Sequence, residues 1–314
     1  MAIVSNTFLT YSAIGQREDL ADVIYNIAPT DTPFMNNIGK NKATAITHEW
    51  QTDTLDAAAA NAQFEGDDVS FTAATVTSRL VNTCQISRKE IIVSGTLDAV
   101  SKAGRRKEMV YQMAKRAKEL KRDCEFILTN NQAPVVAGSA GATVARQLRP
   151  LCSWYSSNDN RGTGGADGSA SAAATDGTQR PLTESIAKNV IQSAWTEGGD
   201  IDLVMTGAFN KTVISGFAGN STRFDKGEDK RLVASIDVYV SDFGTHKIVA
   251  NRFSRARDAH FLDTQYWAVS YLRPMFTEDL AKTGDASKGV HTVEYTLESR
   301  NEASSGIAAD LTTS

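Results

Sequence analysis

The stretch FEGDDVSFTAATVTSRLVNTCQI, residues 64–86, decides the fold class. In its second half, Val76, Leu80 and Cys84 are all at even-numbered positions, and the residues between them are mainly polar. A period of two is typical of a β-strand with one buried face. The Gly-Asp cluster that precedes it is typical of a turn, so residues 46–94 are predicted to form one long β-hairpin.

The acidic tip of this hairpin is a candidate contact site. Glu65, Asp67 and Asp68 lie there between Phe64 and Phe71. Three interpretations stay open: solvated carboxylates, salt bridges with a neighbouring subunit, or a cation site that lacks calcium-binding spacing. Because an isolated two-stranded ribbon is marginal in water, we expect the hairpin to lie over an adjacent copy of the chain.

The next segment, residues 95–131, carries a clear helical pattern. Its apolar positions recur at spacings of three, four and seven, which is typical of an amphipathic helix. At 1.5 Å per residue, a helix over this whole segment is longer than most globular domains require. The apolar positions are Ala103, Val110, Met113, Ala117, Leu120, Cys124 and Ile127.

The same segment is strongly basic. Between Lys102 and Arg122 there are nine basic and two acidic residues, although the whole chain has a net charge of -4. The overall charge gives no general attraction to nucleic acid, so any such contact depends on this patch. The patch is interpreted as a solvated face, a contact with acidic neighbours, or a surface toward packaged nucleic acid. The candidate residues are Arg105, Arg106, Lys115, Arg116 and Arg122.

The N-terminal region, residues 1–45, is predicted to be an extended arm. Two prolines within residues 29–33 break any helix. No basic residue precedes Arg17 and no long apolar run is present, so neither a secretory signal nor a membrane anchor is expected. The candidate arm contacts are Arg17, Asp31 and Phe34.

The second half of the chain alternates between helical and strand patterns. A Gly/Ser-rich stretch, residues 156–180, has little apolar material and is predicted to be a mobile surface loop. Helices are predicted at 183–195 and 209–219, and Thr183 is the expected cap of the first one. Strands are predicted at 201–205, 236–241, 247–250, 259–262, 267–272 and 290–299, with a polar loop at 282–289.

No constellation of catalytic residues is found in the sequence. Gly39-Lys40-Asn41 lacks the Ser or Thr that follows Gly-Lys in a phosphate-binding loop. Ser185 and Lys188 have the Ser-x-x-Lys spacing of one enzyme class, but the other motifs of that class are absent. The four histidines are scattered, and the three cysteines are odd in number and unpatterned, which favours buried thiols in a reducing compartment. We therefore expect no catalytic, cofactor or metal site, and no enzyme activity.

Several strings in the chain resemble the major capsid proteins of tailed bacteriophages, specifically the SU10-like family. The resemblance covers nearly the whole chain except the Gly/Ser-rich stretch. The strings are PTDTPF at 29–34, HEWQTD at 48–53, DVYVSDFG at 237–244, YLRP at 271–274, LAKTGD at 280–285 and VEYTLE at 293–298.

The resemblance implies an α+β fold of the Hong Kong 97 type. Such a fold has an N-terminal arm, an extended β-hairpin loop, a spine helix, a peripheral domain and an axial domain. The expected assignments are the arm at 1–45, the extended loop at 46–94, the spine helix of the peripheral domain at 95–131, the axial domain at 132–258 with its Gly/Ser-rich loop, and peripheral strands with the C-terminus at 259–314.

The resemblance also implies a function. Members self-assemble into hexamers and pentamers of an icosahedral shell that encloses the double-stranded DNA of a tailed phage, so the expected location is the virion capsid, assembled in the host cytoplasm. The expected partners are copies of the chain, packaged DNA through non-specific contact, and the portal, with scaffolding or decoration proteins as further candidates and no membrane. An internal scaffolding segment and lysine-to-asparagine crosslinking are not expected. A cellular nanocompartment shell of the same fold and a DNA-binding protein using helix 102–122 remain alternatives.

Overall fold

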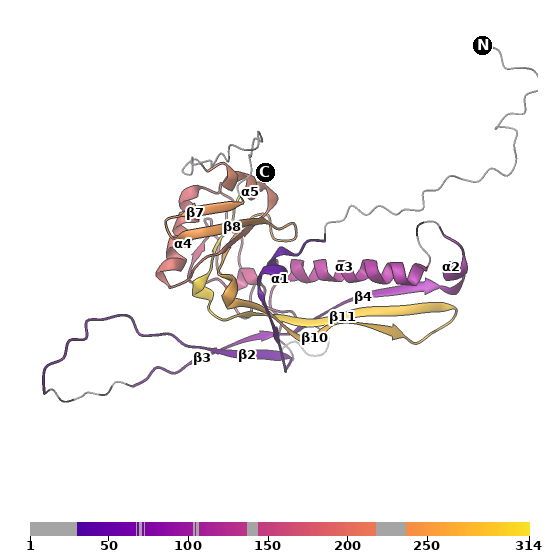
Figure 1. Cartoon of the computed structure of the whole chain (residues 1–314), viewed down its shortest axis with the longest axis horizontal. Helices are drawn as coiled ribbons and strands as arrows, with labels where there is room; N and C mark the ends of the chain where they lie inside the picture. Colours follow the sequence, from indigo (N-terminus) through magenta and orange to yellow (C-terminus); the bar gives the residue numbers. More distant parts are fainter. Residues whose placement is uncertain are drawn as a thin grey trace, which may run out of the picture.

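The computed structural model describes residues 30–66, 68, 71, 73–102, 104, 107–136, 144–217 and 237–314. Its body consists of two β-sheets with helices packed on them, and a long loop extends away from the body (Figure 1). Among the described helices, none is both long and apolar enough to cross a membrane. Four residues predicted as contacts lie outside the described residues: Arg17, Asp67, Arg105 and Arg106.

The first sheet has four strands in the order β1-β10-β11-β4. The antiparallel pair β10 and β11 forms a long hairpin at its centre, with β1 added in parallel on one side and β4 antiparallel on the other. Both central strands were predicted, but they run farther than expected, and β11 includes part of the predicted polar loop. The bounds are Gly39–Lys42 for β1, Gln85–Ser94 for β4, Trp267–Leu280 for β10 and Ala286–Ser299 for β11.

Helix α3, Glu108–Thr129, lies along one face of this sheet (Figure 1). Leu120, Cys124 and Leu128 recur every four residues and are at most 2% exposed. They pack in one hydrophobic core with residues of the two long strands, including Trp267 and Tyr295. The sequence pattern predicted Leu120 and Cys124 on this face, which fixes the helix to the sheet, but Val110, also predicted there, is 64% exposed.

The predicted helix over residues 95–131 is wrong in its first third. The segment begins with a short helix α2, Gly95–Ala99, which ends before α3 starts. Between the two, Gly104 has a φ of 74°, a left-handed conformation that glycine adopts without strain. The carboxylate of Asp98 accepts a hydrogen bond from the backbone N–H of Glu108 at 3.0 Å, so α2 supplies the cap of α3. At 22 residues, α3 spans about 33 Å.

The extended loop has strands only at its base. Strand β2, Thr47–Thr52, pairs antiparallel with β3, Ser78–Thr83, and the described residues between them form no strand. Gly66 is in a turn, as expected, with a φ of 81°. The predicted hairpin boundary at residue 94 is wrong, because residues 85–94 belong to the first sheet as β4. Alanine-rich residues 56–61 offer few side chains for cross-strand pairing, which accounts for the open loop.

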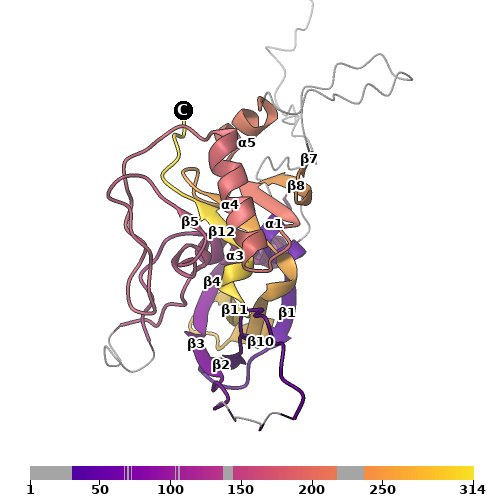
Figure 2. The same cartoon turned by 90° about the vertical axis from the view of Figure 1, so that its left-hand side faces the viewer.

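The second sheet has six strands in the order β5-β12-β9-β6-β8-β7. Helix α4, Glu184–Thr196, covers β5 and β12 (Figure 2), and α5, Ala208–Ser215, packs on β8. Thr183 caps α4 as predicted, accepting from the N–H of Ile186 at 3.3 Å. The strand bounds are Asp159–Asn160, Leu203–Thr206, Val238–Ser241, Gly244–Ala250, Ala259–Leu262 and Gly306–Ala308 for β5, β6, β7, β8, β9 and β12.

The two sheets do not divide the chain at residue 258. Strands β9 and β12 were expected to join the peripheral strands, but they lie inside the second sheet. In the opposite direction, Leu148, Leu151 and Trp154 pack in the hydrophobic core that contains the buried side chains of β10 and β11 and that also includes residues of β6, β9 and β12. The remaining short helices are α1 at Pro33–Asn37, η2 at Leu151–Ser153, η3 at Thr264–Tyr266 and η4 at Glu302–Ser304.

The Gly/Ser-rich stretch at 156–180 is held in place, contrary to the prediction of a mobile loop. The carboxylate of Asp310 accepts backbone hydrogen bonds from Gly162 at 3.0 Å and from Gly177 at 2.8 Å. Asp310 has a φ of 60° and also accepts from Arg257 at 2.6 Å. A Cβ on Gly162 would lie 2.1 Å from the carbonyl oxygen of Thr178. The glycines therefore permit close packing of backbone segments.

Candidate subunit contact surfaces

The extended loop, residues 53–77, presents large apolar side chains to solvent. Leu55 is 99% exposed, Phe71 is 94% exposed, Val76 is 93% exposed and Phe64 is 86% exposed. Full burial of one such side chain contributes roughly 1.5–3 kcal/mol. A monomer gains none of this free energy, and an exposed apolar surface of this kind marks a site of contact with another molecule.

The predicted tip residues lie on this loop. Phe64 and Phe71 flank the tip, and Glu65 and Asp68 are exposed beside them. Hydrogen bonds in the loop join near neighbours, such as the Gln63 amide donating to Asn61 at 2.9 Å. Figure 1 shows that the loop leaves the body on the side opposite to α2.

The base of the loop is anchored by a buried carboxylate, Glu298, on β11. It accepts hydrogen bonds from Asn41 at 2.9 Å, from Ser270 at 2.7 Å and from Arg300 at 3.0 Å, and it lies 3.2 Å from His48 on β2. Burial raises the pKa of Glu298, but these four contacts outweigh burial and lower the pKa to about 2. The ionised carboxylate therefore joins β2 to the first sheet.

Packing of the β2–β3 ribbon on the core adds to this anchor. Trp50 on β2 and Leu80 on β3 lie directly opposite each other in the ribbon, and both pack against the core that holds β10 and β11. The indole N–H of Trp50 donates to the carbonyl of Ser299 at 2.7 Å. The loop thus projects from a fixed base.

The exit of the N-terminal arm is fixed by Glu125 on α3. Its carboxylate oxygens accept from the backbone N–H groups of Phe34 at 2.7 Å and Met35 at 3.0 Å, so α3 caps the short helix α1. The amide of Asn251 donates to the same carboxylate at 2.7 Å. Among the predicted arm contacts, Phe34 is fully buried in the subunit's own core, whereas Asp31 is exposed. Phe34 is therefore an anchor within the subunit.

The predicted basic face on α3 is only partly available. Lys115 is exposed, but Arg116 forms an ion pair with Glu119 at 2.6 Å. Arg122 is half-buried, with its guanidinium 5.3 Å from the ring centroid of Phe253, so it packs within the subunit. The described lysines that remain exposed on the helix and its cap are Lys107, Lys115, Lys118 and Lys121.

These lysines share the outer face of the helix. At 100° per residue they fall within an arc of roughly 120°, which adjoins the apolar face on the side of Lys121. The buried positions of α3 include Glu108 and Glu125, so neither of these carboxylates is exposed beside the lysines. The outer face of α3 is therefore positive despite the acidic balance of the whole chain.

The anchoring residues Glu125 and Glu298 were not identified as functional from the sequence. Each contacts a residue that is distant along the chain, and neither belongs to a motif with a fixed spacing. The histidines that the sequence left unassigned include His246 and His291. In the structure these two form hydrogen bonds with Ser241 and Thr277, so both have partners within the fold.

Comparison with known proteins gives consistent results. The family model described as SU10 major capsid protein matches residues 3–312. The major capsid protein of Escherichia phage Phieco32 is 26% identical, and the match covers 96% of each chain. Among solved structures, the capsid of cyanophage A-1(L) has a TM-score of 0.66 at 13% identity, covering 98% of this chain and 99% of that one. The capsid of a native GTA particle has a TM-score of 0.60 at 10% identity, covering 96% and 97%.

Proposed function

Because this chain belongs to the SU10 major capsid protein family, it is a tailed-phage major capsid protein with the Hong Kong 97 type α+β fold, and we propose that its copies join into the pentamers and hexamers of an icosahedral shell. The observation that carries this proposal is the extended loop 53–77, whose apolar side chains are exposed and project away from the body. We propose that the loop lies on the adjacent subunit and that the residues N-terminal to α1 contact a neighbour as well.

The geometry of the loop favours a second copy of the chain as the molecule that the loop contacts. A loop of this length, folded back at Gly66, reaches about 40 Å from its base. A contact in which every copy extends a loop onto the next copy is heterologous, and such contacts close into rings when the rotation between copies permits. Rings of five and six copies then tile a closed shell.

The two sheets are candidates for the two domains of the subunit. We propose that the first sheet with α3 forms the peripheral domain and that the second sheet, with β9 and β12 included, forms the axial domain at the centre of each ring. The family match with phage capsid proteins favours a DNA genome over the enzyme cargo of a nanocompartment. On this proposal the chain resides in the virion shell after assembly in the host cytoplasm, beside a portal and any scaffolding or decoration proteins.

A second contact is proposed for the outer face of α3. Its lysines Lys115, Lys118 and Lys121 form a positive surface without interleaved aromatic side chains. Such a surface binds phosphates without reading sequence. We propose that this face contacts the packaged double-stranded DNA non-specifically.

The assembly role is tested by removing the tip of the loop. Deletion of residues 60–72 is expected to leave a folded, soluble subunit that forms no shells, because the deleted segment is remote from both cores. Negative-stain microscopy and analytical ultracentrifugation provide the readout, and circular dichroism checks the fold. Intact particles from the deletion variant would refute the proposal.

Two double variants test whether the apolar side chains of the loop, and not only its length, are needed for assembly. Phe64→Ser with Phe71→Ser removes the exposed apolar area and is expected to raise the protein concentration needed for assembly by at least about tenfold, which equals about 1.4 kcal/mol per subunit. Phe64→Leu with Phe71→Leu keeps most of the area and is the matched control. Equal assembly of the serine and leucine variants would show that these side chains do not form the contact.

A further inference from the structure

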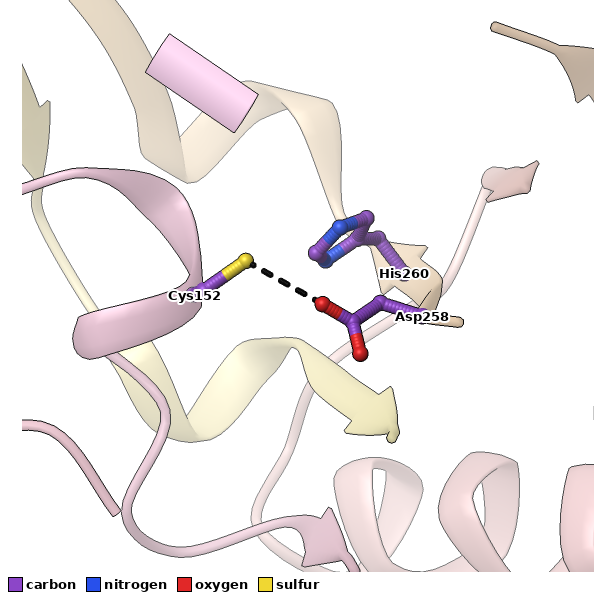
Figure 3. A group of neighbouring side chains, drawn as sticks. All are labelled: Cys152, Asp258 and His260. Carbon is purple, nitrogen blue, oxygen red and sulfur yellow. Dashed lines mark hydrogen bonds between the residues drawn. The ribbon is translucent and has the colours of Figure 1, made fainter. Parts of the chain in front are cut away.

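Three side chains that bind metal ions in other proteins meet inside the subunit. Cys152 comes from η2, and Asp258 and His260 come from the segment that enters β9 (Figure 3). The potential ligand atoms of the three all lie within 4.8 Å of one another. Cys152 and Asp258 are each 1% exposed and His260 is fully buried. The cluster lies where the core of the first sheet meets the second sheet.

Polar atoms in this cluster lack partners. Both ring nitrogens of His260 and one carboxylate oxygen of Asp258 are buried and form no hydrogen bond with any residue that the structure describes. Leaving such a group unpaired costs roughly 1–3 kcal/mol, and buried polar groups are therefore almost always satisfied. Three unpaired atoms at one place indicate that a group bound there completes their interactions.

The donor set fits a borderline metal ion. His260 is fully buried, and neither of its ring nitrogens bonds to another described residue, so one of them is available to bind a metal ion. The thiol sulfur of Cys152 lies 3.6 Å from Asp258 Oδ2. One sulfur, one imidazole nitrogen and one carboxylate oxygen are ligands that Zn²⁺ accepts together.

The surrounding charges accommodate the ion. Arg255 and Arg257 form ion pairs with three carboxylates, those of Asp176, Asp258 and Asp310, so this network carries one net negative charge. When Zn²⁺ binds, the thiol of Cys152 releases its proton to solvent and becomes a thiolate. Replacement of this proton by Zn²⁺ adds one positive charge in total, and the network with the bound ion is then neutral.

We propose that Cys152, Asp258 and His260 bind one Zn²⁺ ion, with a water molecule as the fourth ligand. Metal–ligand bonds of about 2.0–2.3 Å place ligand atoms about 3.5 Å apart, so the cluster closes by roughly 1 Å on binding. Because the side chains of the cluster are almost fully buried, the ion would be held inside the subunit, where it joins η2 to β9.

The test measures metal content directly. Untagged particles are purified without chelator, dialysed against Zn²⁺ and then against buffer, and analysed by inductively coupled plasma mass spectrometry. About one zinc per subunit is expected for the wild type. Cys152→Ser and His260→Phe are expected to weaken binding more than about 100-fold, since loss of an outer-shell partner alone costs 10–100-fold. The Phe ring keeps the stacking with Tyr155, whose centroid is 5.8 Å away.

Matched controls make the outcome decisive. Cys84→Ser changes another buried thiol outside the cluster and is expected to keep the wild-type zinc content. Wild-type protein loaded with Co²⁺ is expected to show a thiolate-to-metal charge-transfer band, which requires no variant to fold. Wild-type protein without bound zinc and without this band, or a Cys152→Ser variant with full zinc content, would overturn the proposal.

Discussion

At the scale of single residues, Glu298 is positioned to control how firmly the extended loop is attached. Its carboxylate contacts β1, β2, β10 and the residue that follows β11 through Asn41, His48, Ser270 and Arg300. The folded-state pKa of about 2 lies below the ordinary value of 4.5, so ionisation of Glu298 stabilises the fold. The difference corresponds to about 3 kcal/mol.

This pKa shift predicts a pH dependence. The stabilisation is fully present above pH 4.5, the unfolded value, and is lost as the pH falls toward 2. Glu298→Gln is therefore expected to lower the melting temperature of particles by about 5 °C at pH 7 and to have little effect near pH 2. Differential scanning calorimetry across this range measures it. Glu90→Gln, an exposed carboxylate of β4, is the control, and an equal loss in both variants would contradict the assignment.

Individual anchors of this kind were beyond sequence-based prediction. Glu298 lies in the predicted strand 290–299, but its partner Asn41 is 257 positions away. The same distance problem hides Cys152, which is 106 positions from Asp258. Rules based on sequence spacing find residues that lie on the same helix, strand or loop. Glu298 and Asn41, and likewise Cys152 and Asp258, are brought together only by the packing of separate elements.

At the scale of elements, the docking of α1 on α3 determines where the arm leaves the body. Glu125→Ala leaves the N–H groups of Phe34 and Met35 without their acceptor in a buried setting. Loss of these bonds is expected to cost about 2–4 kcal/mol locally. Hydrogen exchange of residues 30–38, followed by mass spectrometry on particles, is expected to rise at least about tenfold, with α4 unchanged.

A variant on the same helix provides the control for this prediction. Glu119→Ala removes the ion pair with Arg116 on the outer side of α3 and is expected to leave exchange at residues 30–38 unchanged. If Glu125→Ala and Glu119→Ala gave the same exchange at α1, the capping role of Glu125 would be wrong.

Periodic elements were predictable and contact-dependent ones were not. The apolar spacing that includes Leu120 and Cys124 reflects one buried face of α3, which local sequence records. Alternation in β7 predicted a strand there, but its buried side chain is Tyr239, whereas Val238 and Val240 are exposed. The break before Glu108 depends on a cap from Asp98, which the apolar spacing does not reveal. The order of the 156–180 stretch depends on Asp310, a residue far outside that stretch, so its composition alone indicated mobility.

At the scale of the whole molecule, the proposed DNA contact predicts a salt dependence. Capsomers are expected to bind short duplex DNA with a log–log salt slope that falls by about three when Lys115, Lys118 and Lys121 are changed to Gln. Filter binding at several salt concentrations measures the slope. A control with the same charge change, Lys40→Gln, Lys247→Gln and Lys282→Gln, is expected to keep the wild-type slope. Equal slopes in both triple variants would show that α3 does not bind DNA.

The order of the strands has a consequence for protein synthesis. Strand β5 pairs only with β12 among the described strands, and β12 also separates β5 from β9. Because a ribosome releases residues 159–262 before residues 306–310, the nascent chain lacks the strand that joins these parts together. A nascent chain therefore carries an open second sheet until β12 has been made, and only then can the finished surface be presented to sister subunits.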